Sequence, residues 1–337
     1  MRAIAIARLS GPEGLELREM PDPEPGPGQV RLRVRAAGVN FADHLMTLGL
    51  YVGAPPVPFV PGYEAAGEID KVGPGVERLR PGTRALAVMK TGGYAEYAIV
   101  GADAVVPLPA GKPFKEAAAL PVNYVTAYHA LYVLGNLRPG SRVLVHGAAG
   151  GVGVAALQLA RLRGAEVIGT ASASKHAFAK EQGAAHMIDY RTEDVRARVR
   201  EITGGKGVHL ALDPVGGRSF RDSYASLCET GLLIAYGASA MTDGAGGKLR
   251  ALWTYLSSGF FNPLKMVIDN RGIIGLHLGL MTGESELLAR EMADLVGLWA
   301  AGKIKPHVDA AIPAEEAPEA HRRLQERRNM GKIVITF

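Results

Sequence analysis

The sequence of 337 residues contains a single cysteine, Cys228. A disulfide within the chain is therefore excluded, and so is a zinc centre built mainly from thiolates. The chain also lacks any run of about 18 apolar residues, so no membrane-spanning helix is expected. The first residues, MRAIAIARLSGPEG, do not contain the apolar centre of a signal peptide. We therefore expect a cytoplasmic protein.

The chain also lacks a large excess of charge of either sign. Lys and Arg together number 38 against 33 Asp and Glu, which gives a formal net charge of +5. The densest basic stretch, HRRLQERR at 321–328, is typical of a solvated helix face. This balance argues against a nucleic-acid partner and is compatible with an anionic ligand.

Glycine, with 43 residues, is abundant, and the chain changes its pattern near residue 121. Before that point, short alternating runs are separated by breakers such as PDPEPGPG (21–28), which predicts a β-rich barrel or sandwich. After it, strands alternate with helices, which predicts an α/β domain with a doubly wound parallel sheet. The tail contains a strand at 307–313, a helix at 314–327 and a strand at 331–337, and it can fold back onto the first domain.

The run VLVHGAAGGVG (143–153) changes abruptly from apolar residues to glycine and alanine. It contains the pattern Ala148-x-Gly150-x-x-Gly153 between a predicted strand at 142–146 and a predicted helix at 151–163. In this context the pattern indicates a dinucleotide site, in which the middle glycine lets the backbone approach a pyrophosphate. The N–H groups at the start of the helix would bind the phosphates. The alternative is a tight turn without a ligand.

The second strand of this unit, 165–171, determines which dinucleotide is expected. NAD sites usually carry an acid at the end of this strand to bind the ribose, whereas the present chain has Ala171, followed by Ser172 and Lys175. Hydroxyl and ammonium groups suit a 2′-phosphate, which Tyr190 after the third strand could cover. We predict NADPH rather than NADH; the alternative is that Lys175 merely starts a surface helix.

These motifs resemble the medium-chain dehydrogenase/reductase superfamily over nearly the whole chain. Within it the chain is similar to the zinc-free quinone oxidoreductase branch that includes zeta-crystallin, and most of all to the vesicle amine transport protein homologues. The matching segments are GVNFADHLMTLGLY (38–51), PFVPGYEAAGEI (58–69), AAALPVNYVTAYHAL (117–131), VLVHGAAGGVG (143–153), GTASASKH (169–176) and GIIGLHLG (272–279).

The resemblance implies a GroES-like catalytic domain at 1–120 and 304–337, and a Rossmann NADPH-binding domain at 121–303. It implies reduction of a quinone or an α,β-unsaturated carbonyl compound. It also implies a homodimer, in which the apolar segment GIIGLHLGL (272–280) at the edge of the sheet would pair with the same segment of a second copy. An enoyl-thioester reductase of the same fold is an alternative.

The zinc enzymes of this superfamily carry a cysteine ligand where this chain has Asn40, and a histidine where it has Tyr63. Their four-cysteine structural lobe has no counterpart here. His44, His129 and His277 are scattered along the sequence, and core or surface positions are expected for them. We therefore predict no metal, and an acceptor that takes up hydride readily because the negative charge is delocalised.

The resemblance also implies roles for individual residues. Asn40, Tyr51 and Thr126 are expected near the nicotinamide, and Tyr51 or Tyr63 would donate a proton or a hydrogen bond to the developing oxyanion. Packing is the alternative for each tyrosine, and Leu45 stands where zeta-crystallin-type enzymes often have another tyrosine. The full set of expected cofactor contacts is Asn40, Thr126, Gly150, Gly151, Val152, Thr170, Ser172, Lys175, Tyr190, Tyr236, Gly237 and Ala238.

The segment 246–270 has no assigned role in this scheme. Leu249, Leu252, Trp253 and Leu256 recur at helical spacing, which predicts an apolar helix over 249–261. It could be a lid over a lipophilic substrate, a buried helix or dimer contact, or a lipid-contacting surface. The last possibility supports an alternative function, that of a lipid-binding or interaction protein that binds NADPH with little or no turnover.

Overall fold

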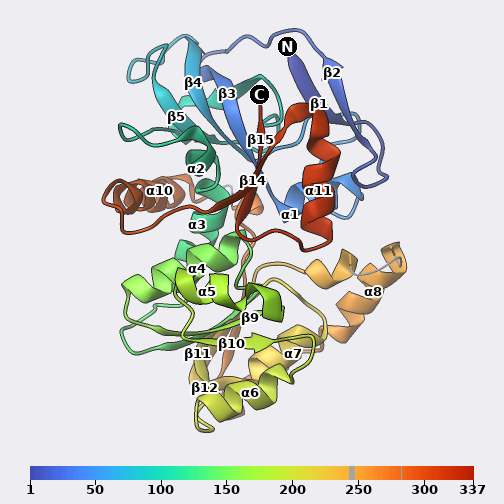
Figure 1. The fold of residues 1–337 in the computed structure, drawn as a ribbon, viewed down its shortest axis with the longest axis vertical. Coiled ribbons are helices and arrows are strands. Elements are labelled where there is room, and N and C mark those ends of the chain that lie inside the picture. Colours follow the sequence, from blue (N-terminus) through green and yellow to red (C-terminus); the bar gives the residue numbers. More distant parts are fainter. Residues whose placement is uncertain (243–246, 282) are drawn as a thin grey trace. The chain divides into compact units, whose positions relative to one another are not determined.

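The structure is a computed structural model that describes residues 1–242, 247–281 and 283–337 (Figure 1). It divides into two compact units, Met1–Val125 with Glu284–Phe337, and Thr126–Gly283. The expected second boundary at 303/304 differs from this division, because helix α10 (Ser285–Ala300) is grouped with the first unit. The buried Trp299 of α10 explains the difference: its indole donates to Glu116 over 3.2 Å, and its carbonyl accepts from Lys112 over 2.7 Å.

The first unit is built on a seven-stranded sheet with the order β14-β15-β3-β4-β5-β7, in which β6 also pairs with β3. The long strand β3 (Gln29–Val39) is its centre and pairs antiparallel with β15, β4 and β6. The tail therefore does return to the N-terminal strands, as expected. The other strands are β4 (Glu64–Val72), β5 (Arg84–Val88), β6 (Tyr97–Gly101), β7 (Val105–Pro107), β14 (Val308–Pro313) and β15 (Lys332–Thr336), and β1 (Arg2–Ile6) and β2 (Leu15–Glu19) form a separate hairpin.

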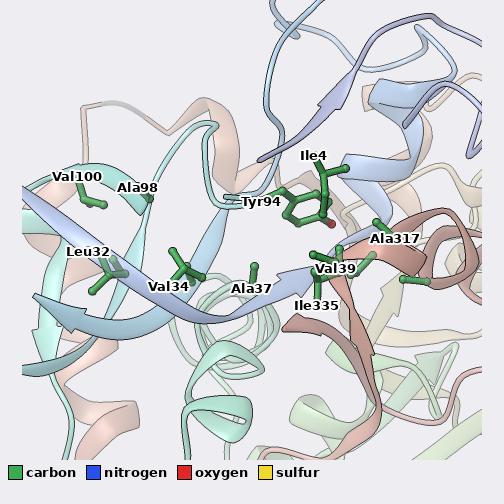
Figure 2. Close-up of a cluster of buried hydrophobic side chains, with 14 of the residues drawn as sticks. Ile4, Leu32, Val34, Ala37, Val39, Tyr94, Ala98, Val100, Ala317 and Ile335 are labelled. Carbon is green, nitrogen blue, oxygen red and sulfur yellow. The ribbon is translucent and has the colours of Figure 1, made fainter. Parts of the chain in front are cut away.

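The core of the first unit follows the alternation of β3, because successive side chains of a strand point to opposite faces. Val30, Leu32 and Val34 are buried while Arg33 and Arg35 between and beside them are exposed. Figure 2 shows Ala98 and Val100 near Leu32, and Ile4, Tyr94, Ala317 and Ile335 grouped around Val39. This β-rich unit is the GroES-like domain.

The second unit contains a parallel six-stranded sheet with the order β10-β9-β8-β11-β12-β13. Helices α4 and α5 lie on one side of it, and α6 and α7 on the other (Figure 1). The chain passes outward from β8 to β10 and then returns to β11 beside β8. The carboxyl ends of β8 and β11 therefore form a topological switch point, the place where ligands bind in such sheets. The predicted doubly wound Rossmann fold is confirmed.

The strands of this unit are β8 (Arg142–His146), β9 (Glu166–Ala171), β10 (His186–Asp189), β11 (Val208–Asp213), β12 (Leu227–Ala235) and β13 (Gly272–Gly275). Its helices are α4 (Gly151–Leu162), α5 (His176–Gln182), α6 (Val195–Ile202), α7 (Arg218–Ala225), α8 (Gly247–Ser257) and α9 (Pro263–Asp269). The remaining helices are α1 (Phe41–Thr47), α2 (Phe114–Ala118), α3 (Pro121–Tyr128) and α11 (Ala317–Gln325). No helix of the described residues is long and apolar enough to cross a membrane.

The helix expected over 249–261 is present as α8, but it ends at Ser257 rather than at 261. Gly259 has a φ of +86°, and Asn262 caps a second helix, α9, that starts with Pro263. The interpretation of this segment as a buried helix is wrong: Leu249 is 79% exposed and Trp253 is 63% exposed. The inward side of α8 carries Thr254, which is 3% exposed. This helix therefore turns a polar residue inward and its apolar stripe outward.

The basic stretch at 321–328 is only in part the solvated face that was expected. Arg322 and Arg328 are exposed and share the carboxylate of Glu319. His321, at the start of the stretch, is fully buried in the first unit, where its ring centroid lies 5.9 Å from that of Tyr94. This stretch therefore has both a buried and an exposed side, and its many charged residues do not reveal the buried position of His321.

Candidate functional site

The glycine-rich turn lies at the switch point of the second unit. Strand β8 ends at His146, Gly150 is the N-cap of α4, and the helix starts at Gly151. The N–H groups of the first helical turn have no acceptor within the helix, so those of Gly151 and Val152 can bind an anion there. A Cβ on Gly153 would lie only 2.3 Å from the carbonyl oxygen of Gly147. The last glycine is therefore needed for close packing of helix on strand.

The region expected to bind a 2′-phosphate lies at the ends of β9 and β10. Their parallel register pairs Ala171 with Asp189, so the following residues, Ser172 and Tyr190, lie side by side. Ala171 is buried, and Lys175 ends the short 3-10 turn that follows. The position at the end of β9 therefore carries no acid. A nearby carboxylate, that of Asp189, accepts a hydrogen bond from the backbone N–H two residues later over 3.0 Å.

One cation of this region was missed by the sequence interpretation. The guanidinium of Arg191 lies over the ring of Tyr190, with 6.0 Å between its Cζ atom and the ring centroid. Stacking of this kind holds the two side chains together at the end of β10. The signal was the dipeptide itself, since Arg191 directly follows the predicted Tyr190.

The side chain of Thr170, a predicted cofactor contact, lies in the interior of the second unit. Its hydroxyl lies 3.2 Å from Nδ1 of His146, whose Nε2 lies 2.9 Å from the hydroxyl of Ser223. Ser223 and Ser219 both donate to Oδ2 of Asp213, over 2.7 and 2.6 Å. All but Ser219 are nearly fully buried. The network joins the carboxyl ends of β8, β9 and β11 to helix α7, and it was not found from the sequence because its members are far apart in the chain.

Asp213 also fixes the loop that borders the next predicted contacts. Its Oδ1 accepts from the N–H groups of Val215 and Gly216, over 2.7 and 3.3 Å. Tyr236, Gly237 and Ala238 follow β12 beside this loop, and the N–H of Tyr236 donates to the carbonyl of Asp213 over 3.1 Å. Burial raises the pKa of Tyr236, so its phenol stays protonated.

The second unit thus brings most of the expected cofactor contacts to one edge of its sheet. These are Gly150, Gly151 and Val152 after β8, Ser172 and Lys175 after β9, Tyr190 after β10, and Tyr236, Gly237 and Ala238 after β12. Thr126 lies on α3 and is 8% exposed. The remaining predicted residues, Asn40, Tyr51 and Tyr63, belong to the first unit.

Asn40 lies at the end of β3 and is almost fully buried. Its Nδ2 donates to Oε1 of Glu64 over 2.9 Å, and its Oδ1 accepts from Nζ of Lys332 over 2.5 Å. Lys332 and Glu64 form an ion pair of 2.5 Å with side chains that are 3% and 0% exposed. Neither residue was predicted; the charges in GYE (62–64) and GK (331–332) were the available signals.

A second buried acid lies next to this pair. Asp43 accepts hydrogen bonds from the backbone N–H groups of Asn40 and Gly62, over 2.9 and 3.2 Å, and from the phenol of Tyr94 over 3.2 Å. Burial is the main cause that raises the pKa of Asp43 to about 6, against the lowering effect of these hydrogen bonds. The carboxyl group therefore anchors the start of α1 and the turn before β4.

Two tyrosines form a pair in the same unit. The rings of Tyr51 and Tyr63 meet edge to face with 6.0 Å between their centroids, and both side chains are half-buried. Burial raises the pKa of each phenol. Their mutual hydrogen bond lowers the pKa of Tyr51 and raises that of Tyr63 further, so Tyr51 is the stronger acid of the two.

The donor set at the zinc positions does not fit a metal ion. The oxygen atoms of Asn40 and Glu64 are occupied by the ammonium group of Lys332, a fixed positive charge that repels a divalent cation. Within the described residues, no group of three or more His, Cys, Asp or Glu side chains has metal-binding geometry. The metal-free state of the protein itself stays a prediction.

Comparison with known proteins agrees with this architecture. Residues 26–110 match the family described as the alcohol dehydrogenase GroES-like domain, and residues 182–335 match the family described as zinc-binding dehydrogenase. The rat synaptic vesicle membrane protein VAT-1 homolog is 41% identical over 99% of this chain and 84% of its own length. The quinone oxidoreductase-like protein 2 homolog of Nematostella vectensis is 34% identical over 90% of this chain and 80% of its own length.

Solved structures extend the comparison to three dimensions. The Escherichia coli quinone oxidoreductase in complex with NADPH superimposes with a TM-score of 0.89 at 31% identity, covering 100% of both chains. The human VAT-1 homolog-like protein superimposes with a TM-score of 0.86 at 33% identity, covering 100% of this chain and 98% of the other. The chain therefore belongs to the medium-chain dehydrogenase/reductase family of oxidoreductases, together with the quinone oxidoreductases and the VAT-1 homologues.

Proposed function

We propose that the protein is an NADPH-dependent reductase that transfers hydride to a quinone or an α,β-unsaturated carbonyl compound without a metal ion. The proposal rests on the residues at the carboxyl ends of the strands in the second unit's sheet. There the N-terminus of α4, capped by Gly150, lies beside the end of β9, which carries no acid and is followed by Ser172 and Lys175. The NADPH complex of the similar quinone oxidoreductase supports the choice of cofactor.

In this proposal the second unit binds the cofactor. The N–H groups of Gly151 and Val152 bind the pyrophosphate, aided by the dipole of the 12-residue helix α4. Ser172 and Lys175 bind the 2′-phosphate, and Tyr190 with the stacked Arg191 covers it. Bound NADPH supplies the hydride; the chain binds and orients it.

The first unit supplies the polar groups for the reduced acceptor. Asn40 contacts the nicotinamide side of the cofactor, and Tyr51 donates a proton to the oxyanion that forms on the acceptor. Tyr63 donates to Tyr51 and thereby directs the proton of Tyr51 outward. No electrophilic metal is required, because a quinone or an enone spreads the incoming negative charge over its own oxygen and ring or double bond.

Cofactor choice can be tested by titrating NADPH and NADH into the wild type and a Lys175→Ala variant. Loss of one charge-assisted hydrogen bond should weaken NADPH binding by about 1.5–3 kcal/mol, or about 10- to 150-fold, and leave NADH binding unchanged. Lys180→Ala, on the following helix α5, is a matched control. Equal affinities of the wild type for the two cofactors would contradict the proposal.

The acceptor can be tested by following NADPH oxidation with a panel of quinones, enals, enones and enoyl thioesters. Turnover of quinones or enones supports the proposal. Turnover restricted to enoyl thioesters would favour the alternative of an enoyl-thioester reductase of the same fold. The absence of turnover with every acceptor, despite NADPH binding, would favour a non-enzymatic role.

One observation supports a second candidate, that of an NADPH-binding protein that docks on lipid. Helices α8 and α9 expose Leu249, Leu256, Leu264 and Ile268, each at least 63% exposed, and Phe260 between them is 89% exposed. Large exposed apolar patches mark interaction sites, and interfacial helices have this character. The relatives named synaptic vesicle membrane proteins add support. Co-sedimentation with liposomes tests this role. In this case we expect a cytoplasmic protein that attaches to the membrane surface.

A further inference from the structure

The ion pair between Lys332 and Glu64 follows from the strand register of the first unit. Lys332 is the first residue of β15, and the antiparallel pairing of Ile333 with Val39 puts it opposite Asn40. The pairing of Ala37 with Ala65 likewise puts Glu64 opposite Gly38. Three segments that are far apart in sequence thus present a cation, an anion and an amide at one point.

Gly38 gives the carboxylate its room. A Cβ at this position would lie 2.4 Å from Oε1 of Glu64 and 2.5 Å from the carbonyl oxygen of Ala118. Any other residue would force Glu64 away from Asn40. The glycine in AAGVN (36–40) therefore permits the contact on which the cluster depends.

The hydrogen bonds of the cluster are nearly complete. Oε1 of Glu64 accepts from Lys332 and Asn40, and its Oε2 accepts from the N–H of Val122 over 2.8 Å. The second hydrogen of the Asn40 amide points to the carbonyl of Gly38, 3.4 Å from Nδ2. Replacing a buried ion pair by apolar side chains is often neutral or stabilising, so stability alone does not account for two buried charges.

These partners determine the orientation of the amide. The two ends of an asparagine side chain have nearly the same shape but opposite hydrogen-bonding character. Lys332 can only donate and the Glu64 carboxylate can only accept. A flipped Asn40 would place its NH₂ against the ammonium and its oxygen against the carboxylate. One of the two orientations is thus excluded, and the hydrogen bond from the Asn40 N–H to Asp43 holds the backbone beneath it.

We propose that Lys332 and Glu64 are positioning residues that hold the amide of Asn40 in one orientation, so that the nicotinamide carboxamide binds in one way and presents one face of its ring to the acceptor. The inference rests on the proposed function, in which Asn40 contacts the cofactor. Lys332 and Glu64 act only through Asn40 and do not touch the cofactor. Their contribution is the selection of one of the two diastereotopic hydrogens at C4 of the nicotinamide.

The test uses the full-length variant Lys332→Met/Glu64→Gln. Removing both charges together leaves neither of them buried without a partner, and the introduced glutamine can both donate and accept, so either orientation of Asn40 is then allowed. The matched control is Arg35→Met/Glu68→Gln, which removes an exposed ion pair of 3.0 Å between the same two strands, β3 and β4. Melting temperature and NADPH affinity are measured for each protein.

The deciding readout is the stereochemistry of transfer. Wild type and control should transfer deuterium from only one of the two C4-deuterated NADPH diastereomers. The double variant should transfer it from both, with kcat/KM lowered at least about tenfold, as for a misplaced reacting group. A purely structural role would lower the amount of folded enzyme without changing which hydrogen moves.

A folded double variant with the stereospecificity and kcat/KM of the wild type would overturn the inference and leave the proposed function intact. A wild type that binds NADPH but reduces no acceptor would overturn the proposed function, and a thermodynamic cycle then decides on the positioning role. Asn40→Ala should weaken NADPH binding in the wild type and have no effect in the double variant. Equal losses in both backgrounds would show that the ion pair does not act through Asn40.

Discussion

Removal of the buried histidine His321 should make the first unit far less sensitive to acid. His321 and His44 are fully buried in this unit, with 6.2 Å between their ring centroids, and neither nitrogen of either ring has a hydrogen-bond partner among the described residues. Burial lowers the pKa of His44 to about 4 and that of His321 to about 3. In the unfolded chain both take up a proton near the usual value of about 6.5.

The free energy of unfolding follows from these values. Between pH 7 and pH 5 the unfolded chain binds two protons that the folded unit does not, so stability is present above pH 6.5 and is lost as the pH falls. Each histidine contributes a loss of about 2 kcal/mol over this interval. Asp43 acts in the opposite sense: its folded pKa of about 6 lies above the unfolded value, so protonation in the folded unit regains about 1 kcal/mol. The expected net loss is about 3 kcal/mol.

The variant His321→Leu removes one of the two losses, so its unfolding free energy should fall by only about 1 kcal/mol between pH 7 and pH 5. Urea unfolding in a Trp253→Phe background measures this, because Trp299, buried in the first unit, is then the only tryptophan of the chain. His186→Leu, which removes an exposed histidine of the second unit, is the control. Identical pH dependence of the wild type and His321→Leu would refute the reasoning.

Further predictions concern the reaction and the assembly. If Tyr51 is the proton donor, Tyr51→Phe should lower kcat about 10²-fold or more, and Tyr63→Phe should lower it by less. Steady-state kinetics of both variants with a quinone and an enone measure these losses, and a larger loss from Tyr63→Phe would reverse the assignment. If α8 covers the substrate, Trp253→Ala should lower kcat/KM at least about tenfold for bulky quinones, with little change in melting temperature or NADPH affinity. An equal loss of kcat/KM for all acceptors, together with a lower melting temperature, would argue against a lid. Loss of liposome binding with unchanged kinetics would favour the lipid surface. Elemental analysis should find no zinc, because the ammonium of Lys332 occupies the oxygen ligands; stoichiometric zinc that turnover requires would contradict this. Light scattering should find a homodimer, because β13 (Gly272–Gly275) is the edge of its sheet; a monomer at micromolar concentration would count against it.

The sequence by itself determined the features that depend on local chemistry. The alternating residues of β3, the change from apolar residues to glycine after β8, and the absence of an acid at Ala171 are all properties of a few adjacent positions. Backbone geometry and side-chain periodicity act over such short stretches, so the Rossmann fold and the glycine-rich turn between β8 and α4 could be predicted. The predicted site residues at this edge come together for the same reason, since parallel strands carry their carboxyl ends to one side.

Only the tertiary structure decided which side chains are free to act. Thr170 belongs to the predicted strand, yet its hydroxyl is bound in the interior to His146. The apolar stripe of α8 has the spacing of a core helix, yet it faces outward, because periodicity defines a face without stating what covers it. The contact of Lys332 with Asn40 joins residues 292 positions apart. Such a contact arises from the register of β15 on β3, and register is decided by the packing of the whole sheet rather than by any local run of sequence.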